Sequence, residues 1–496
     1  MRATSRGPRL ARVSERALPA VHGGSDLMSS QAELAAPSAP PGALPASASV
    51  PNRSALPSPR HPAWADVPES RWNDVGWQLK NAIRNAADLA RFLELSEDER
   101  RATDTLGRVF SFAVTPYYFS LIDPADPDDP IRRMIVPSLE EERSTAFGEV
   151  DPLGEKPDQV APGLTHRYPD RVLFVVTSFC TSYCRFCIRK RNWHDSDAAR
   201  SRQDVDQALA YIRAHPEIRD VLISGGDPLT LPPKQLDHAL TGLRAIPHVE
   251  IVRFGSREPV QLPMRVTAEL VGLLERHAPV WLNTHFNHPR EITADAARAV
   301  DRLLRAGIPV NNQSVLLRGV NDSVEVMREL VQGLLRIKVR PYYLYHCDDV
   351  VGAAHLRTSV RRGLEILEGL RGHTTGFAVP TFVVDAPGGG GKIPLMPNYL
   401  VSQGENSLVV RNFEGVLVRI DDGPVAVSGE AKPSPGAARR NGGRAARAAQ
   451  PPQSIADLLA GEGRRLVPQG LQHYARRRAV AGAKRAGRRR AEKPIP

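Results

Sequence analysis

From residue 171 onward, short β-rich runs alternate with stretches of helical periodicity, and this alternation constrains the fold more than any other feature of the chain. The expected strands are residues 172–177, 221–224, 251–254, 280–282, 310–315, 341–345 and 380–384. The expected helices are residues 207–214, 234–245, 294–306, 324–337 and 360–370. Repeated strand–helix order favours an α/β fold with a parallel sheet, closed or partly closed into a barrel, and with functional groups at the carboxyl ends of the strands.

The segments outside this alternation divide the 496 residues into further parts. Residues 1–65 are rich in Ala, Pro, Ser, Arg and Gly and are predicted to be a disordered extension, within which Met28 offers an alternative start. Residues 66–160 are predicted to be helical, with one amphipathic helix over residues 72–95. The barrel is expected over residues 161–400, closing strands over 401–428, and a basic disordered tail over 429–496.

The net charge of +11 belongs to the tail and not to the body of the chain. Residues 429–496 hold 16 Lys and Arg against 4 Asp and Glu, whereas the remaining residues hold 50 against 51. The barrel is therefore not expected to bind nucleic acid, and contact with an acidic partner is left to the tail, which we interpret first as a solvated extension. No apolar run is long enough to span a bilayer, so no membrane partner is expected.

Three of the four cysteines, Cys180, Cys184 and Cys187, follow the first expected strand with the spacing C-x3-C-x2-C. Four cysteines are too few for a disulfide framework, which indicates a reducing compartment, the cytoplasm. Three thiolates on one loop can hold three corners of an iron–sulfur cube and leave the fourth iron open for a small molecule such as S-adenosylmethionine. The alternative is a zinc site completed by a histidine such as His194. Cys347 is interpreted as a buried apolar residue.

Two further motifs follow expected strands. Ser224-Gly225-Gly226-Asp227 comes after the second strand, where glycines allow a close backbone approach to a ligand and Asp227 could pair with an ammonium group. Lys392 ends a run of four glycines after the last expected strand. The run departs from a nucleotide-binding P-loop at both ends, so nucleotide binding is not expected. The lysine is suited to forming a Schiff base with a carbonyl cofactor, and the alternative is that the glycine run is an ordinary linker.

Three charged residues near these motifs are candidate substrate ligands. Arg189 lies two residues past the last cysteine of the motif, and Asp348 and Asp385 lie at the ends of the last two expected strands. One guanidinium can hold a carboxylate through two hydrogen bonds, and two carboxylates can hold a cation at the far end of a substrate. The alternative for all three is an ordinary capping or surface role.

Together with other strings along the chain, these motifs resemble the lysine 2,3-aminomutase family of radical S-adenosylmethionine enzymes. The matching strings are residues 164–172, 180–191, 255–259, 283–289, 312–322, 340–343 and 385–392. They run in order over about residues 70–420, and both tails lie outside them. The resemblance implies a partial β/α barrel that binds a [4Fe–4S] cluster on the three cysteines, S-adenosylmethionine and pyridoxal 5′-phosphate.

The resemblance also implies a role for each matching side chain. Lys392 corresponds to the lysine that binds pyridoxal phosphate, and Arg189 to the arginine that holds the substrate carboxylate. Asp348 and Asp385 correspond to the pair that holds the side-chain ammonium. Further residues expected to face pyridoxal phosphate are Arg167, Tyr168, Arg171 and Gln313. Those expected to face S-adenosylmethionine are Ser224, Gly225, Gly226, Asp227 and His285.

The implied activity is that of a 2,3-aminomutase, an isomerase that converts L-lysine to L-β-lysine, with L-arginine as the alternative substrate. The expected partners are the amino acid, a one-electron reductant such as flavodoxin or ferredoxin, and further copies in a homo-oligomer. Phe186 stands where some members have histidine, and the extra cysteines of a structural zinc site are missing. A non-catalytic binding protein that uses the basic tail is the alternative of a different class, and the intact cysteines and Lys392 argue against it.

Overall fold

The computed structural model describes residues 56–106, 110–145, 147–192, 199–404 and 407–422, together with residues 454–455, 458 and 465–466. Most of the two predicted disordered segments, residues 1–65 and 429–496, lies outside these ranges. Within the described ranges, no helix combines the length and the apolar character that crossing a bilayer requires.

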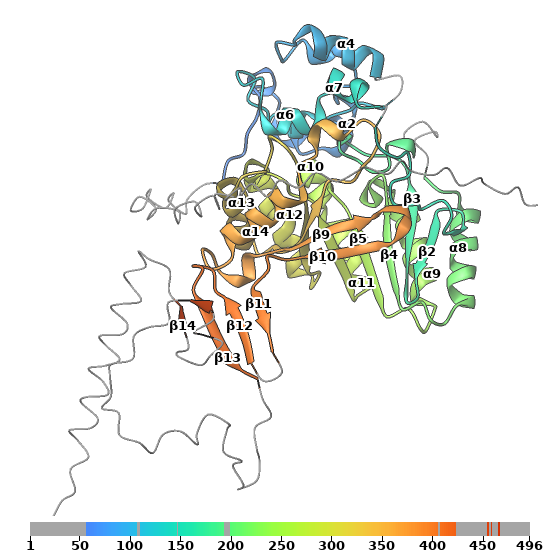
Figure 1. The fold of residues 1–496 in the computed structure, drawn as a ribbon. Coiled ribbons are helices and arrows are strands. Elements are labelled where there is room, and N and C mark those ends of the chain that lie inside the picture. Colours follow the sequence, from blue (N-terminus) through green and yellow to red (C-terminus); the bar gives the residue numbers. More distant parts are fainter. Residues whose placement is uncertain are drawn as a thin grey trace, which may run out of the picture. The chain divides into compact units, whose positions relative to one another are not determined.

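The centre of the fold is a ten-stranded sheet in which the strands follow one another in sequence order from β1 to β10 (Figure 1). The parallel strands are β3 (Arg171–Thr177), β4 (Asp220–Gly225), β5 (Ile251–Gly255), β6 (Val280–Thr284), β7 (Val310–Leu316), β8 (Arg340–His346) and β9 (Thr381–Ala386). At the edges, β1 (Gln159–Ala161), β2 (Leu164–Tyr168) and β10 (Gly391–Leu395) pair antiparallel with their neighbours. Every strand predicted between residues 172 and 384 is therefore confirmed.

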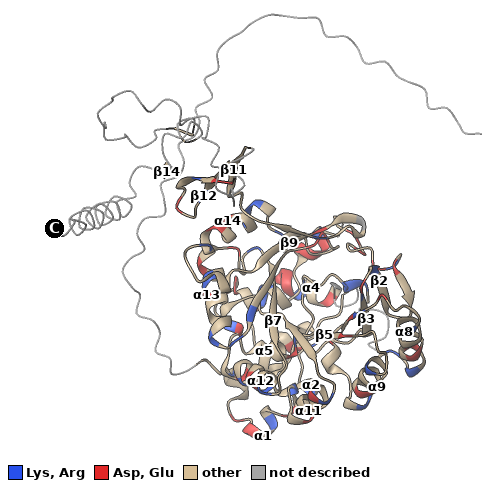
Figure 2. Cartoon of the chain, turned by 90° about the horizontal axis from the view of Figure 1, so that it is seen from below, with Lys and Arg blue, Asp and Glu red and all other residues tan. Residues whose placement is uncertain are grey.

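Helices alternate with these strands and surround the sheet, and acidic and basic residues are interspersed along them (Figure 2). They are α8 (Arg202–Ala214), α9 (Pro233–Arg244), α11 (Ala268–Arg276), α12 (Ala294–Arg305), α13 (Val324–Arg336) and α14 (Val360–Leu370). The five predicted helices are confirmed, and α11 was not predicted. Along β4, β5 and β7, buried side chains such as Val221 and Phe254 alternate with partly exposed ones such as Leu222, Arg253 and Gln313. The buried set belongs to the hydrophobic core, whereas the partly exposed set faces an open lumen.

The two edges of the sheet meet at the glycine run. Lys392 N donates to Tyr168 Oη at 3.3 Å, which joins β10 to β2 although these strands form no ladder with each other. Gly391 has a φ of +82°, and a Cβ there would lie 2.9 Å from Tyr168 Oη. At Gly389, with a φ of +83°, a Cβ would lie 3.2 Å from the guanidinium of Arg167. Glycine is required at both positions because β2 presses against this loop, and the sheet is a partial barrel, as predicted.

The N-terminal region is helical, but the single helix predicted over residues 72–95 is wrong. Three short helices stand there instead, α1 (Glu69–Trp72), α2 (Val75–Lys80) and α3 (Ala86–Leu89). The reason is that the side chains of Asp74 and Asn85 each accept a backbone N–H and begin a new helix. The region continues through α4 (Glu97–Leu106), α5 (Pro116–Phe119), α6 (Pro130–Ile135) and α7 (Leu139–Arg143).

The boundary predicted at residue 65 also differs from the structure. The 3-10 helix η1 (Pro62–Trp64) places Trp64 in the main hydrophobic core, with its side chain largely buried. Pro57 O accepts from Ala294 N at 3.0 Å, so the chain already contacts the first turn of α12 at this point. Residues 56–65 are therefore part of the folded body.

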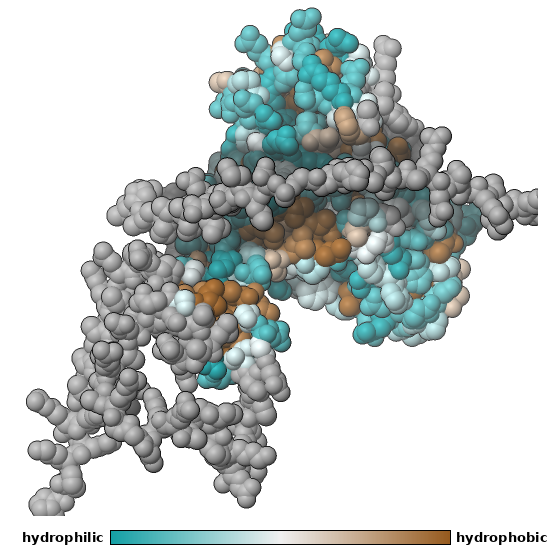
Figure 3. All heavy atoms as spheres, in the orientation of Figure 1, coloured by the Kyte–Doolittle hydropathy of each residue, from teal (hydrophilic) through white to brown (hydrophobic). Residues whose placement is uncertain are grey.

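A second sheet of four antiparallel strands consists of β11 (Leu400–Gln403), β12 (Ser407–Arg411), β13 (Leu417–Asp421) and β14 (Arg465–Leu466). β12 and β13 confirm the two strands predicted after residue 400. They form a sheet separate from the barrel, and β14 lies in the segment predicted to be a disordered tail. Hydrophobic side chains gather on the surface of this sheet (Figure 3), among them the exposed Leu400, Val401 and Ile420.

Candidate active site

A cavity of about 710 Å³ in the lumen brings together every side chain that the sequence identified as a candidate site residue. Its walls come from β2 and β10 at the edges of the sheet and from the parallel strands between them. The predicted residues that line it are Arg167, Tyr168, Arg171, Cys180, Cys184, Cys187, Arg189, Ser224, Gly225, Gly226, Asp227, His285, Gln313, Asp348, Asp385 and Lys392. The prediction that the carboxyl ends of the strands meet in one site is confirmed.

The cysteine loop, residues 178–191, leaves the carboxyl end of β3 and brings its three thiols to the cavity. Burial raises the pKa of Cys180 well above its usual value and also raises the pKa of Cys187, so these two thiols are neutral in the free chain. Cys184 Sγ accepts a hydrogen bond from Arg257 Nη1 at 2.6 Å. Buried thiolates require a compensating positive charge, so this donor set fits an iron–sulfur cluster whose irons each take one thiolate.

The zinc alternative finds no support in the described residues. His194, its suggested fourth ligand, lies outside them. Among the described residues, no three His, Cys, Asp or Glu side chains gather as they would around a single metal ion. A cluster does not require such a gathering, because each thiolate binds a different iron. Cys347 is 1% exposed and packs in the hydrophobic core, which confirms its predicted apolar role.

A buried carboxylate fixes the cysteine loop from behind. Glu141 of α7 accepts from Arg185 Nε and Nη2, both at 2.7 Å, and from Lys190 Nζ at 3.0 Å. Burial alone raises the pKa of Glu141, but the two cations outweigh it and lower the pKa to about 2. Lys190 also donates to Gly352 O at 3.0 Å. Two positions of the loop are therefore tied to the folded body by charge-assisted hydrogen bonds.

The glycine pair at the carboxyl end of β4, Gly225 and Gly226, packs closely against the backbone of the protein itself. A Cβ at Gly225 would lie 2.3 Å from Thr177 O, and one at Gly226 would lie 2.2 Å from Phe179 O. Gly226 N donates to Thr177 O at 2.7 Å. We expected these glycines to admit a ligand to the backbone. They line the cavity, but what leaves no room for a side chain at these positions is the backbone at the start of the cysteine loop, which lies directly against them.

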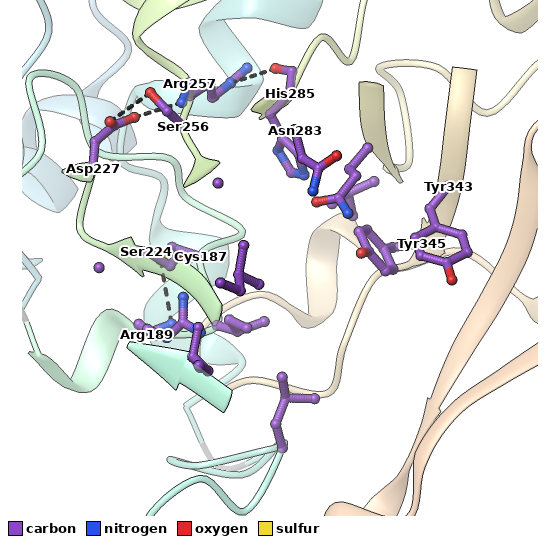
Figure 4. A pocket seen from close by; sticks show the side chains of 18 of the residues that line it. Cys187, Arg189, Ser224, Asp227, Ser256, Arg257, Asn283, His285, Tyr343 and Tyr345 are labelled. Atoms are coloured by element: carbon purple, nitrogen blue, oxygen red, sulfur yellow. Dashed lines mark hydrogen bonds between the residues drawn. The ribbon is translucent and has the colours of Figure 1, made fainter. Parts of the chain in front are cut away.

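Asp227 hydrogen-bonds within the protein instead of presenting a free carboxylate (Figure 4). Its carboxylate accepts from Ser256 Oγ at 2.7 Å, from Arg257 N at 2.6 Å and from Leu229 N at 3.0 Å. Arg257 Nε donates in turn to His285 O at 2.9 Å. Burial lowers the pKa of His285 to about 3, so its imidazole is neutral. In the ligand-free chain, Asp227 therefore organises the loops after β4, β5 and β6.

The lysine loop, residues 385–392, carries the charged groups of the opposite edge of the sheet. Lys392 Nζ donates to both carboxylate oxygens of Asp385 at 3.0 Å and lies 4.8 Å from the ring centre of Tyr345. The carboxylate of Asp348 accepts no hydrogen bond from, and forms no ion pair with, any described residue. Burial and the charge of Asp385 raise the pKa of Asp348 to about 7. The three groups carry one negative charge more than positive when both carboxyls are ionised.

The residues expected to face pyridoxal phosphate gather beside this loop. Arg167 contacts Gly389 and donates to Asp158 Oδ2 at 2.7 Å, and the guanidinium of Arg171 lies 4.1 Å from the ring centre of Tyr168. Two cations next to a glycine run and an amine are the groups that a phosphorylated aldehyde requires. The residues present therefore fit the cofactor.

Several lining residues were not identified from the sequence. They are Glu155, Arg253, Ser256, Arg257, Gln261, Asn283, Tyr342, Tyr343 and Tyr345, with Tyr343 and Tyr345 on the far side of the cavity from Asp227 in Figure 4. Five of them belong to strings that carried the resemblance, which was the only available signal for them: Ser256, Arg257, Asn283, Tyr342 and Tyr343. Glu155 precedes the first strand and belongs to none of those strings.

Two protein-family models match the chain. The radical SAM superfamily model matches residues 174–331, and the lysine-2,3-aminomutase model matches residues 367–493. The second match passes residue 420, where the resemblance was expected to end, and takes in the basic segment. The predicted family and cofactors are otherwise confirmed.

Curated relatives match over most of the chain. The L-lysine 2,3-aminomutase of Clostridium subterminale is 48% identical over 417 residues, which are 84% of this chain and 98% of that protein. The L-lysine 2,3-aminomutase of Bacillus subtilis is 51% identical over 71% of this chain and 75% of its own length. The glutamate 2,3-aminomutase of Clostridioides difficile is 45% identical over 72% and 84%. With these relatives and with cysteines and a lysine that meet in one cavity, the chain belongs to the lysine 2,3-aminomutase family, radical S-adenosylmethionine enzymes that also use a [4Fe–4S] cluster and pyridoxal phosphate.

Proposed function

We propose that this protein is an L-lysine 2,3-aminomutase, which moves the α-amino group of L-lysine to the β-carbon. The observation that carries the proposal is the charge of the cavity at Asp348, Asp385 and Lys392, where two carboxylates face one cation. A substrate with a cationic side chain supplies the missing positive charge, whereas the side chain of glutamate adds a third carboxylate.

The proposed substrate lies between groups from distant strands. Arg189 lies on the loop after β3, whereas Asp348 follows β8 and Asp385 lies near the end of β9. The ligands of the two ends of the amino acid therefore come from opposite parts of the sheet. Arg189 takes the α-carboxylate, and the two aspartates take the side-chain ammonium. Holding the amino acid at both ends fixes its α- and β-carbons in the cavity.

The chemistry itself belongs to the cofactors. When bound, the cluster and S-adenosylmethionine supply a carbon radical, and pyridoxal phosphate supplies the group that carries the migrating nitrogen. Cys180, Cys184 and Cys187 would hold the cluster, and Lys392 would hold pyridoxal phosphate with the help of Arg167. The protein contributes positioning, because it brings the ligands of the cofactors and of the substrate together in one cavity.

Substrate choice tests the proposal directly. The reconstituted enzyme is incubated without oxygen with a strong reductant and, in separate reactions, with L-lysine, L-arginine or L-glutamate, and the products are identified by mass spectrometry and NMR. We expect L-β-lysine as the main product. Formation of β-arginine or β-glutamate without β-lysine would overturn the proposed substrate.

Two substitutions test the proposed cofactor ligands by absorbance, independently of turnover. Cys184→Ala is expected to abolish the brown iron–sulfur absorbance, and Lys392→Ala to remove the absorbance of lysine-bound pyridoxal phosphate. Each variant is the control for the other, because it should keep the band that the other loses. Retention of both bands in both variants would contradict these roles.

A one-electron reductant such as flavodoxin or ferredoxin is the proposed partner, because the cluster must be reduced in each activation. We further propose that the protein works in the cytoplasm, where thiols remain reduced, and assembles as a homo-oligomer. Activity with purified flavodoxin in place of the chemical reductant tests the first of these proposals. Light scattering of the purified enzyme tests the last.

A further inference from the structure

A strap, residues 147–158, completes the cavity wall beside the cysteine loop and joins α7 to β1. At one end, Glu149 N donates to Asp349 O at 2.7 Å, next to the predicted ammonium ligand Asp348. At the other, Arg167 Nη2 donates to Gly154 O at 2.6 Å. The strap is thus attached to both sides of the site. Because its backbone is fixed in this way, a side chain that it directs to the cavity is held in one place.

Glu155 is that side chain, and it binds two arginines of the cysteine loop. Its Oε1 accepts from Arg189 Nη2 at 2.7 Å, and its Oε2 accepts from Arg189 Nε at 3.2 Å and from Arg191 Nη2 at 2.6 Å. The side chains of Glu155, Arg189 and Arg191 are 10%, 16% and 9% exposed. Burial alone raises the pKa of Glu155, but the two guanidinium groups lower it to about 2, so this carboxylate is ionised.

The two arginines differ in which hydrogen-bond donors of their guanidinium groups are still available to a ligand. Arg191 also donates to Ile188 O from Nη1 at 3.1 Å and forms an ion pair with Asp151 at 3.1 Å. Glu155 occupies only the Nε–Nη2 edge of Arg189, and no described residue accepts from Arg189 Nη1. A planar guanidinium has a second edge that can take another carboxylate at the same time. Arg189 is therefore held on one edge and open on the other, within the cavity.

We propose that Glu155 is a positioning residue for the substrate carboxylate, which fixes Arg189 so that its open edge points to the bound amino acid. The proposal deepens the proposed function and rests on it, because it takes Arg189 as the ligand of the α-carboxylate. Without Glu155, the long side chain of Arg189 would have to be ordered by the substrate itself, and the affinity for the substrate would fall.

Loss of the Glu155 charge could also raise the affinity for the substrate, so the direction of the change in affinity tests the proposal. Removal of a negative charge beside Arg189 leaves the pocket more positive, and this alone would tighten the binding of a carboxylate. Glu155 would then be a competitor of the substrate rather than its support. The two roles predict opposite changes in affinity for the same substitution.

The experiment compares L-lysine with L-lysinamide, which lacks the carboxylate, in the holoenzyme and in its Glu155→Gln variant. Affinities are measured from the change in absorbance of the bound cofactor, and KM and kcat from β-lysine formation. We expect Glu155→Gln to weaken the binding of L-lysine at least tenfold, with the change mainly in KM. The binding of L-lysinamide should weaken less than twofold. The iron–sulfur and pyridoxal bands should stay unchanged. Equal loss of both ligands would assign Glu155 a merely structural role, and tighter binding of L-lysine would make it a competitor; either result overturns the proposal.

Asp151→Asn is the matched control, because Asp151 pairs with Arg191 and forms no hydrogen bond or ion pair with Arg189. It should change the affinity for either ligand less than threefold, and a loss of L-lysine binding as large as that of Glu155→Gln would contradict the specific role of Glu155. Failure of the proposed function is seen separately, in the unaltered enzyme. If that enzyme turns over another amino acid instead of L-lysine, the same comparison is made with that amino acid and its amide.

Discussion

The cysteine loop and the lysine loop line the same cavity but keep their charges in different ways. The cysteine loop balances Arg185, Lys190, Arg189 and Arg191 with buried carboxylates of the chain itself. The lysine loop leaves Lys392 34% exposed, and the carboxylate of its neighbour Asp348 forms no ion pair with any described residue, although the charges of Lys392 and Arg357 lower its pKa slightly. The cations of the cysteine loop are thus neutralised within the protein, Arg189 included, although its proposed role is to bind the substrate carboxylate. At the lysine loop, two carboxylates share one lysine, and the second carboxylate is left for the proposed substrate ammonium to balance.

The largest effect is expected where this internal neutralisation is removed. Glu141→Ala leaves Arg185 and Lys190 buried without a counter-charge, and breaking such a pair costs about 3–5 kcal/mol. The free energy of unfolding, measured with urea, should fall by that amount, and the reconstituted protein should bind less iron. Glu140→Ala is the control, since Glu140 is an exposed neighbour paired with Arg143, and it should cost less than about 1 kcal/mol. Equal stabilities of the two variants would contradict the structural role of Glu141.

A smaller effect is expected at the lysine loop, where geometry and not charge fixes the chain. Gly391→Ala places a side chain at a φ of +82° and 2.9 Å from Tyr168 Oη, which should cost about 1–2 kcal/mol of stability. It should also weaken the absorbance of lysine-bound pyridoxal phosphate. Gly376→Ala adds the same methyl group in open space and should leave that absorbance unchanged. If both variants kept the full absorbance, the contact between the loop and β2 would not position Lys392.

The smallest effect concerns the unbalanced carboxylate. With a pKa of about 7, Asp348 loses its charge as the pH falls from 8 to 6, and a neutral carboxyl attracts the substrate ammonium less. The KM for L-lysine should therefore rise by up to about tenfold over this range, since one pKa unit corresponds to ~1.4 kcal/mol. Steady-state kinetics in a buffer of constant ionic strength measures it. Asp348→Asn, which cannot ionise, should flatten the profile; a profile that stays as steep would assign the titration to another group.

The sequence predicted the elements that repeat and the site residues that follow them. Strands such as β4 and β7 carry a local pattern, and parallel strands bring their carboxyl ends together whatever the details of packing. The helix predicted over residues 72–95 failed because Asp74 and Asn85 offered capping side chains that periodicity does not weigh. Glu155 was missed because an ion pair across 34 residues leaves no local signal. The approach of Gly226 to Phe179 O depends on how two loops pack in three dimensions, which no local sequence pattern encodes.

Because buried and lumen-facing residues alternate along β4, β5 and β7, neighbouring residues of one strand are selected for different properties, stability at one position and substrate binding at the next. Residues directed to the helices supply the apolar contacts that keep the domain folded, and a substitution there lowers its stability. Positions directed to the lumen, such as Arg253 and Gln313, contribute little to that packing. Substitutions at the lumen-facing residues of these strands, which are every second residue, can therefore change which amino acid the enzyme rearranges while the hydrophobic core stays intact.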